Sequence, residues 1–397
     1  MTNSAENSVY IVAAKRTAIG SFQGQFANTP STQLGAAVIK ATMDEVSINP
    51  NDIEEALIGC VLPAGLGQAP ARQAVLHAGL PLSVRCTTVN KVCGSGMKTV
   101  MMAHDTIKSG SASLVIAGGI ESMTMAPYLL PKARGGYRMG HAQMLDHMFF
   151  DGLQNPYDGN MMGIFAETCA DKYSYSREAQ DEFSAESVRR AMNAIETGAF
   201  DQEIVPVEVK SRKDTVMVAQ DEEPPKCDIS KIPHLRPAFR SESGTVTAAN
   251  ASKISDGASM TLLASADYVQ KNNLKPLARI VGHHQFAHEP EWFTTAPVNA
   301  MQQLMEKINW SVEDVDLFEI NEAFAVVTMA AMDELNIPHE KVNVNGGATA
   351  LGHPIGASGN RILVTLIHAL KNRGLKRGIA SLCIGGGEAT AIAVEIL

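Results

Sequence analysis

The chain has 397 residues, of which 45% are hydrophobic and 19% are charged, and its formal net charge is −9. This length is too great for one ordinary hydrophobic core and indicates two or three domains. The negative net charge argues against a nucleic-acid partner. Because no apolar run is long enough to cross a bilayer, we expect no membrane partner.

The six cysteines include neither a CxxC pair nor a set with zinc-ligand spacing. The first residues, MTNSAENS, resemble neither a signal peptide nor a transit peptide, and the final EIL is not a peroxisomal signal. We therefore expect free thiols and a cytoplasmic location.

Short apolar runs at 9–14, 56–61 and 114–117 predict strands, and residues 32–46 predict a helix with a partly apolar face. We expect the third of these strands to end at Gly118-Gly119. Strands that alternate with helices in this way indicate a layered α/β protein with a largely parallel sheet.

Cys93 lies inside a distinctive unit at 87–109: a β-type run, the cysteine, a turn with Gly94 and Gly96, and then a helical pattern. At a helix start, unpaired N–H groups and the helix dipole stabilise an anion. We therefore expect this thiol to lose its proton readily and to act as a nucleophile. The alternative is a small buried residue, which is what most free cysteines are.

The pattern changes between residues 121 and 244. Up to about residue 150 the chain is rich in Met, Gly and aromatic residues without a clean period, which we interpret as an inserted interaction segment. Residues 176–197 predict a helix with Ser176 as its N-cap. The cations that follow form either a solvated charged face or a patch for a phosphate-bearing ligand: Lys210, Arg212, Lys213, Lys226, Lys231, Arg236 and Arg240.

The last third of the chain repeats the order of the Cys93 unit: a β-type run, a turn at Gly356–Gly359 and a helix with one apolar face. Three correspondences support the repeat, namely Ser95-Gly96 with Ser358-Gly359, Gly110 with Gly374, and strand 114–118 with strand 381–385. Such a repeat predicts two similar halves with a site between them.

Three further residues can do chemistry: Asn321 follows the probable strand 315–320, and His353 and Cys383 stand in or beside glycine-rich turns. Turns of this kind let a backbone approach a ligand and aim N–H groups at an oxyanion. We expect no metal site, because the neighbouring histidines lack a convincing partner carboxylate: His283, His284 and His288.

Five motifs, in order, resemble those of the thiolase family: NKVCGSGMK, GTVTAANAS, NEAFA, GGATALGHPIGASG and LCIGGG. The resemblance implies an α/β fold with two similar halves in a five-layered α-β-α-β-α core. Residues 1–120 with 245–275 would form one half and 276–397 the other. Residues 121–244 would form an inserted loop domain for coenzyme A (CoA) binding and for the contacts of a homotetramer.

The resemblance also implies the chemistry, a reversible condensation of two acetyl-CoA molecules to acetoacetyl-CoA and CoA. His353 would activate Cys93, which takes the acetyl group, and Cys383 would remove a proton from the second acetyl-CoA. A water held by Asn321 would serve the enolate oxygen, and the N–H groups of Cys93 and Gly385 would serve the tetrahedral intermediate. No cofactor is expected, since CoA is itself a substrate and product.

By the same resemblance, Ser252 would contact the pantetheine arm, and Lys226 is the nearest cation for the CoA nucleotide. The residues expected to line the acyl and pantetheine channel are Leu153, Met162, Phe239, Ala323 and Phe324. Their bulk favours a short acyl group. The chain departs from common family residues at Met161, Ala249, Lys253, Glu388 and Ala389.

Other functions remain as alternatives. A broad-range 3-ketoacyl-CoA thiolase of fatty acid β-oxidation would use the same residues, and Met161, where short-chain members often carry histidine, favours it. A ketoacyl-ACP synthase would lack Cys383, and a silent CoA-binding protein would not need all of the catalytic candidates. A dinucleotide-binding module would need a G-x-G-x-x-G turn that we do not find.

Overall fold

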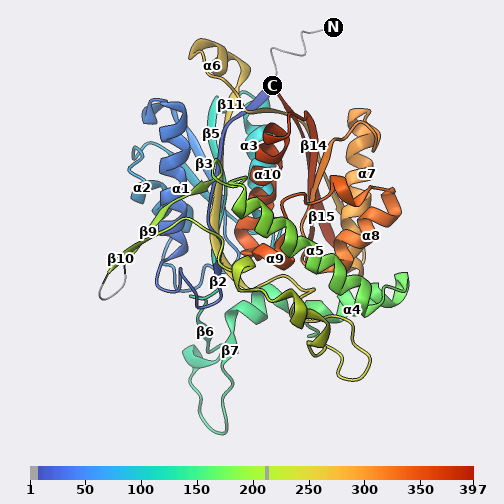
Figure 1. Cartoon of the computed structure of the whole chain (residues 1–397). Coiled ribbons are helices and arrows are strands. Elements are labelled where there is room, and N and C mark those ends of the chain that lie inside the picture. The colour runs from blue at the N-terminus through green and yellow to red at the C-terminus, as the bar shows by residue number, and fades with distance from the viewer. Residues whose placement is uncertain (1–7, 211–213) are drawn as a thin grey trace.

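A computed structural model describes residues 8–210 and 214–397. Its elements stack in five layers, helix, sheet, helix, sheet and helix, as the sequence resemblance implied (Figure 1). The central layer contains α3 (Ser95–Lys108), α9 (Ala348–Leu351) and α10 (Ile355–Asn372). One outer layer contains α1 (Ser31–Val46) and α2 (Pro70–His77), and the other contains α7 (Ala296–Ile308) and α8 (Ala325–Leu335).

The strands of the first half follow the order β4 (Arg85–Val89), β3 (Glu55–Gly59), β5 (Leu114–Ser122), β11 (Ser255–Ser265) and β1 (Val9–Thr17). Those of the second half follow the order β12 (Ala278–Ala287), β15 (Glu388–Ile396), β14 (Arg377–Ile384) and β13 (Leu317–Ile320). The two halves join where β1 pairs with β12, at Tyr10↔Arg279 and Ile11↔Ala278.

The expectation of a largely parallel sheet is wrong. Among the strands described, parallel pairing is limited to β3 with β4 and β5, β13 with β14, and the two-residue β8 (Ile204–Val205) with β1. The inner strands pair antiparallel, because β15 follows β14 through a short glycine turn and β11 and β12 return along their neighbours.

The repeat is visible in the packing of α3 against α10 in the central layer. The two helices touch at Gly96 and Gly359: a side chain on either glycine would press against the backbone of the other helix. Gly110 and Gly374 follow the two helices with φ of 75° and 66°, a left-handed conformation that favours glycine.

Three predicted boundaries in these repeated units are wrong. β5 continues through Gly118-Gly119 to Ser122, because these glycines let β11 and α10 approach closely; an added Cβ on Gly119 would collide with the carbonyl oxygen of Gly356. The segment Gly356–Gly359 is the first turn of α10 rather than a loop. The last repeated strand begins at Arg377, four residues before the predicted start.

The inserted segment contains a protruding hairpin and two helices. Strands β6 (Tyr128–Leu129) and β7 (Leu145–Asp146) form the hairpin, which extends away from the layers (Figure 1). A π-helical turn (Phe149–Leu153), α4 (Met162–Tyr173) and α5 (Arg177–Glu196) follow. The predicted N-cap of α5 is confirmed, since Ser176 Oγ accepts a hydrogen bond of 3.1 Å from the N–H of Ala179.

A buried ion network fastens this insertion to β1. Arg16 donates to Glu203 at 2.6 Å and to Asp221 at 2.7 Å, and all three side chains are fully buried. Breaking such a network would leave an uncompensated buried charge. The remaining short elements are β2 (Gly20–Ser21), β8 (Ile204–Val205), β9 (Val207–Lys210), β10 (Thr215–Val218) and α6 (Ala266–Lys271). Among the helices described, none combines the length and the apolarity that crossing a membrane requires.

Candidate active site

The catalytic candidates come from both halves. Cys93 lies between β4 and α3, and Asn321 directly follows β13. His353 lies between α9 and α10, Cys383 lies near the end of β14, and Gly385 lies in the turn to β15. Because the repeat stacks the two sheets on the same central helices, these strand ends and helix starts meet at one end of the central layer.

The environment of His353 fixes its charge and its tautomer. Ser358 donates its single hydroxyl proton to the carbonyl oxygen of Pro354 at 3.0 Å, so its oxygen accepts from Nδ1–H of His353 at 2.6 Å. Nε2 then carries the lone pair, and it is a buried atom without a partner within the described part of the chain. Burial, and next the charge of Arg361, lower the pKa of His353 to about 3, so the ring is neutral.

Cys93 does not have the acidic thiol that its position at a helix start predicted. Burial raises its pKa to about 11, while the N–H groups of Gly385 and of Cys93 itself point at the sulfur and act in the opposite direction. The desolvation of the thiolate therefore outweighs the helix dipole. A neutral thiol needs a general base to become a nucleophile, and His353, with a neutral ring, can accept a proton at Nε2.

The loop that carries Cys93 is strained and held from both sides. Val92 has φ of 46°, which is unusual for a β-branched residue. Asn90 Oδ1 accepts from Val92 N–H at 2.9 Å, and Ser95 Oγ accepts from Lys91 N–H at 2.9 Å and donates to the Val92 carbonyl at 2.6 Å. These bonds fix the direction in which the nucleophile points.

Cys383 and Asn321 are both about 1% exposed. Burial, together with the nearby charge of a Cys93 thiolate, raises the pKa of Cys383 well above that of a free thiol. Asn321 is held by its backbone N–H, which donates to the Ser381 carbonyl at 3.0 Å. Both polar side-chain atoms of Asn321 are buried and have no partner among the residues described. An amide in this state is suited to binding a water.

Glu322 organises the segment behind Asn321. Its carboxylate accepts from Ser187 Oγ at 2.8 Å, from Asn343 Nδ2 at 2.8 Å and from Thr349 Oγ1 at 2.6 Å. These partners lie on α5, in the loop after β13 and α8, and on α9, the short helix that precedes His353. One buried carboxylate thus ties the Asn321 and His353 segments together.

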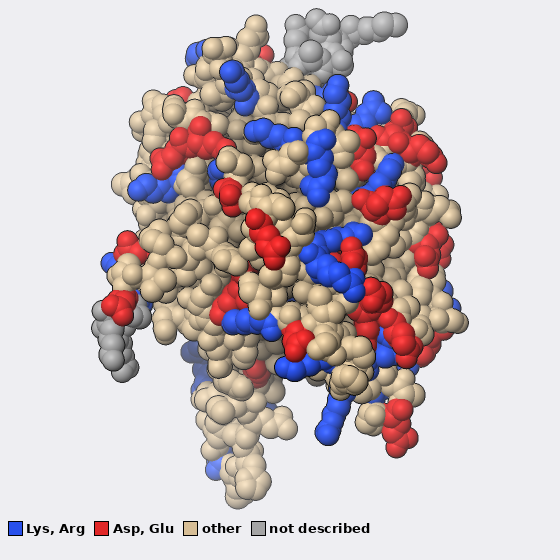
Figure 2. All heavy atoms as spheres, in the orientation of Figure 1, with Lys and Arg blue, Asp and Glu red and all other residues tan. Residues whose placement is uncertain are grey.

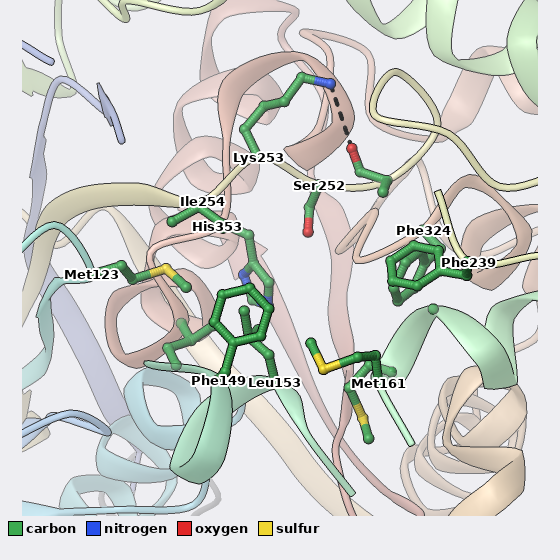
Figure 3. A pocket seen from close by; sticks show the side chains of 14 residues that line it. Met123, Phe149, Leu153, Met161, Phe239, Ser252, Lys253, Ile254, Phe324 and His353 are labelled. Carbon is green, nitrogen blue, oxygen red and sulfur yellow. Dashed lines mark hydrogen bonds between the residues drawn. The ribbon is translucent and has the colours of Figure 1, made fainter. Parts of the chain in front are cut away.

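A pocket of about 240 Å³ opens beside these residues (Figure 3). Its wall contains six of the residues chosen from the sequence: Leu153, Met162, Phe239, Ser252, Phe324 and His353. Cys93 packs with Met123, Leu153 and Ile355 on one side, and Cys383 packs with Met162, Phe239 and Phe324 on the other. Neither cysteine is itself in the wall, but each belongs to an apolar cluster that supplies part of the wall.

Two binding candidates lie outside this wall. Ala323 is buried behind it, with its carbonyl oxygen accepting from Ser252 N–H at 2.9 Å. Lys226 does not line the pocket, and its ammonium forms an ion pair with the Glu222 carboxylate at 2.6 Å.

Three other cations of the 210–240 stretch are also paired: Lys210 with Glu208 at 3.7 Å, Lys231 with Asp228 at 3.1 Å and Arg240 with Asp171 at 2.5 Å. Arg236 is exposed and forms no ion pair with the residues described. Arg212 and Lys213 lie outside the described residues. On the face in Figure 2, positive and negative side chains alternate without a continuous basic area. This pairing favours the solvated charged face over a phosphate patch.

The departures from common family residues have local roles. The Lys253 stem lines the pocket, but its ammonium turns away to the carbonyl oxygens of Ala248, Ala249 and Ala251 (Figure 3). Glu388 forms an ion pair with Lys91 and so connects the loops of the two cysteines. The side chain of Met161 faces the pocket.

Sequence reasoning missed several residues of the site. Ser358 was noted only as part of the repeat, although its position five residues after His353 in a helical turn was a usable signal. Glu121 is fully buried, accepts from the N–H groups of Val61, Leu62 and Gly356, and has its pKa raised by burial to about 7. The lining residues Met123, Phe149, Ile254 and Ile355 carry no signal beyond their apolarity.

A neutral thiol, a neutral histidine with a free Nε2 and a second buried cysteine around one pocket define a cysteine-dependent acyl-transfer enzyme. Sequence profiles of the thiolase N-terminal and C-terminal domains match residues 9–267 and 274–396. The chain belongs to the thiolase family. The domain division predicted at residue 275 stays a prediction.

Individual relatives agree over nearly the whole length. The acetyl-CoA acetyltransferase of Chromobacterium violaceum is 51% identical over 98% of this chain and 99% of its own, and that of Schizosaccharomyces pombe is 48% identical over 98% of both. The crystal structure of the Bacillus anthracis acetyl-CoA acetyltransferase has a TM-score of 0.96 and 41% identity, covering 98% of this chain and 99% of that one. The Acat5 thiolase of Ascaris suum in complex with coenzyme A has a TM-score of 0.93 and 42% identity, covering 98% and 100%.

Proposed function

We propose that this chain is an acetyl-CoA C-acetyltransferase, which condenses two acetyl-CoA molecules to acetoacetyl-CoA and CoA and also runs in reverse. The observation that carries the proposal is that Cys93 and Cys383 belong to two apolar clusters that supply the walls of one small pocket, which His353 also lines. The relatives named acetyl-CoA acetyltransferase and the Ascaris suum thiolase with bound coenzyme A support the choice of substrates.

In the first half-reaction, Nε2 of His353 takes the proton of Cys93 as the sulfur attacks the thioester carbon. The negative oxygen of the tetrahedral intermediate, formed beside the Cys93 sulfur, would accept from the N–H groups of Cys93 and Gly385, which point at that sulfur in the resting enzyme. Cys383, a thiol because its pKa is raised, gives its proton to the sulfur of the departing CoA. The products are an acetyl-cysteine, an imidazolium and a Cys383 thiolate.

In the second half-reaction, the Cys383 thiolate removes a methyl proton from a second acetyl-CoA. A thiolate with a raised pKa is a strong base, which suits this weakly acidic C–H group. The enolate oxygen receives Nε2–H of His353 and a water held by Asn321. The carbanion attacks the acetyl-cysteine, and the Cys93 thiolate that leaves recovers its proton from His353.

Every proton transfer in this scheme has a donor and an acceptor in the protein or the substrates. We therefore propose that no cofactor is used and that CoA is only substrate and product. An imidazolium is costly in this buried position, as the low pKa of His353 indicates. It forms only while a negative oxyanion or thiolate shares the pocket. In the resting enzyme the proton therefore stays on Cys93, and His353 is neutral.

The pocket walls support a short acyl group. Phe149 and Met161 add to the bulk of Leu153, Phe239 and Phe324 around a volume of about 240 Å³. Forcing extra methylenes into a closed pocket costs about 1–3 kcal/mol, roughly ten- to a hundredfold in rate constant. In an open channel each buried methylene would instead contribute about 0.8 kcal/mol to binding.

The test is thiolysis of 3-ketoacyl-CoA substrates of four, six, eight and twelve carbons under one set of conditions. We expect kcat/KM to fall as the chain lengthens. If kcat/KM instead rises with chain length, the broad-range 3-ketoacyl-CoA thiolase replaces this proposal. Met161 in the pocket wall would then account for the preference for longer chains.

We also propose a homotetramer in the cytoplasm. All six cysteines are free thiols, which suits a reducing compartment. The protruding hairpin exposes Tyr128 (62%), Met139 (97%) and Met144 (66%), and exposed apolar groups of this kind are typical of subunit contacts. Lys226 remains our candidate for the CoA nucleotide, because it is the cation at the position nearest to the family's arginine.

A further inference from the structure

Two histidines and one carboxylate that the proposed reaction does not use meet away from the pocket. His104 and Asp105 lie in the last turn of α3, and His283 lies on β12. By the rise of a helix, His104 is roughly 15 Å from the start of α3, where Cys93 lies. The sequence suggested no partner carboxylate for His283, because Asp105 precedes it by 178 residues.

The three side chains converge on one point. Asp105 Oδ1 lies 3.0 Å from Nδ1 of His104 and 2.9 Å from Nε2 of His283, and the three ligand atoms all lie within 4.8 Å of one another. The rings stand edge to face, with centroids 5.0 Å apart and an interplanar angle of 88°. Ligands at about 2.1 Å from a zinc-like ion stand roughly 3.0–3.4 Å from each other. The two separations that involve Asp105 already fit this range, and the two ring nitrogens would have to approach each other from at most 4.8 Å.

Burial and charge prepare these groups as ligands. The His104 and His283 side chains are 12% and 14% exposed, whereas Asp105 is 63% exposed and leaves an entry from solvent. Positive groups stand nearby: Lys108 acts on His104, and Lys307 and Lys98 act on His283. Neutral imidazole is the form that binds metal, and it prefers ions of the zinc, nickel and cobalt class.

We propose that His104, Asp105 and His283 bind a divalent ion of this class, with water in the open positions, and so connect α3 to the sheet of the second half. Each ring would move its proton to its other nitrogen, so that three lone pairs face the ion. The same lysines oppose a second positive charge nearby, so moderate rather than extreme affinity is expected. The site would stabilise the fold and take no part in acyl transfer.

Cobalt provides the test, because its spectrum reports the ligands. Chelator-treated whole protein is titrated with CoCl₂ and followed by visible absorption. We expect d–d bands that saturate at one ion per chain, without the near-ultraviolet charge-transfer band that thiolate ligands produce. ZnCl₂ added afterwards removes these bands, and saturation with Zn²⁺ raises Tm.

Variants locate the ion. His283→Gln and the surface change Asp105→Asn should each weaken cobalt binding at least tenfold while leaving kcat unchanged. His284→Gln is the matched control, since His284 points to Gln303 at 2.8 Å instead, and it should bind as wild type. Absence of saturable d–d bands would show a hydrogen-bonded cluster only. If the bands persist in His283→Gln, or if a thiolate charge-transfer band accompanies them, the ion binds elsewhere. Each of these outcomes, like the absence of bands, overturns the proposal.

Discussion

The hydroxyl oxygen of Ser358 lies 2.6 Å from Nδ1 of His353, and this contact decides which ring nitrogen faces the substrate. Since the hydroxyl proton goes to the Pro354 carbonyl, Nδ1 carries the ring proton and Nε2 is free to accept one. The base of the proposed reaction is thus set by a serine that touches no substrate.

Replacing Ser358 with alanine should lower the rate of acetylation roughly 10- to 100-fold, a part of what a general base contributes. The reason is loss of the tautomer and of the ring orientation, so KM for acetyl-CoA should change little. The measurement is the burst of CoA released on mixing with acetyl-CoA. Ser259→Ala is the control, because Ser259 is equally buried and bonds to the Ala357 carbonyl at 2.8 Å without touching His353. Equal losses in both variants would indicate a general packing effect.

The raised pKa of Cys93 predicts how its alkylation depends on pH. Iodoacetamide reacts with the thiolate, and a pKa of about 11 leaves on the order of one thiol in a thousand ionised at pH 8. The rate of modification of Cys93, followed by peptide mass spectrometry, should therefore keep rising up to the highest pH at which the fold survives. A rate that is already constant by pH 8 would instead show a thiolate–imidazolium pair in the resting enzyme.

The ion pair between Lys91 and Glu388 joins the two cysteine loops, and Glu388 is a departure from common family residues. The pair is partly exposed, so Glu388→Ala should change the free energy of unfolding by less than about 1 kcal/mol. Without the ion pair the two cysteine loops are held less firmly, so acetylation should be about two- to fivefold slower. High salt screens the pair and should therefore also slow acetylation by the wild type. Glu208→Gln, which breaks a surface pair with Lys210 at 3.7 Å, should do neither.

The protruding hairpin predicts the assembly. Deleting residues 132–140, the tip of the hairpin that extends away from the layers (Figure 1), should convert tetramers to dimers that keep measurable activity, because none of these residues lines the pocket. Sedimentation velocity gives the size of both proteins. On the face shown in Figure 2 the hairpin is mostly uncharged, and its charged residues are Lys132, Arg134, Arg138 and Asp146. An intact protein that sediments as a monomer at micromolar concentration would refute the tetramer.

The sequence was most informative where short motifs carry the chemistry. Cys93 and His353 follow or precede glycines at which a Cβ would collide with neighbouring side chains, Gly94 with Ile384 and Gly352 with Ser255, and α5 begins at the predicted Ser176 cap. The predicted element boundaries at Gly118-Gly119 and Gly356–Gly359 were wrong. These glycines allow neighbouring backbones to pack closely and do not form turns. Local sequence cannot distinguish the two uses.

Properties that depend on distant residues were also beyond prediction. The pKa of Cys93 follows from burial by both halves, which no local pattern at a helix start contains. Likewise, the Asp105 carboxylate contacts the His283 ring only because the two halves stack. The Glu322 carboxylate binds hydroxyl groups on α5 and α9, which lie far apart in the sequence.

The central claim is that Cys93 receives the acetyl group and that Cys383 moves protons. The most direct measurement is intact-protein mass spectrometry after mixing with acetyl-CoA. Cys93→Ala should gain no acetyl group, whereas Cys383→Ser should gain one that hydroxylamine removes, while forming almost no acetoacetyl-CoA. A hydroxylamine-sensitive acetyl group on the Cys93→Ala protein would contradict the account.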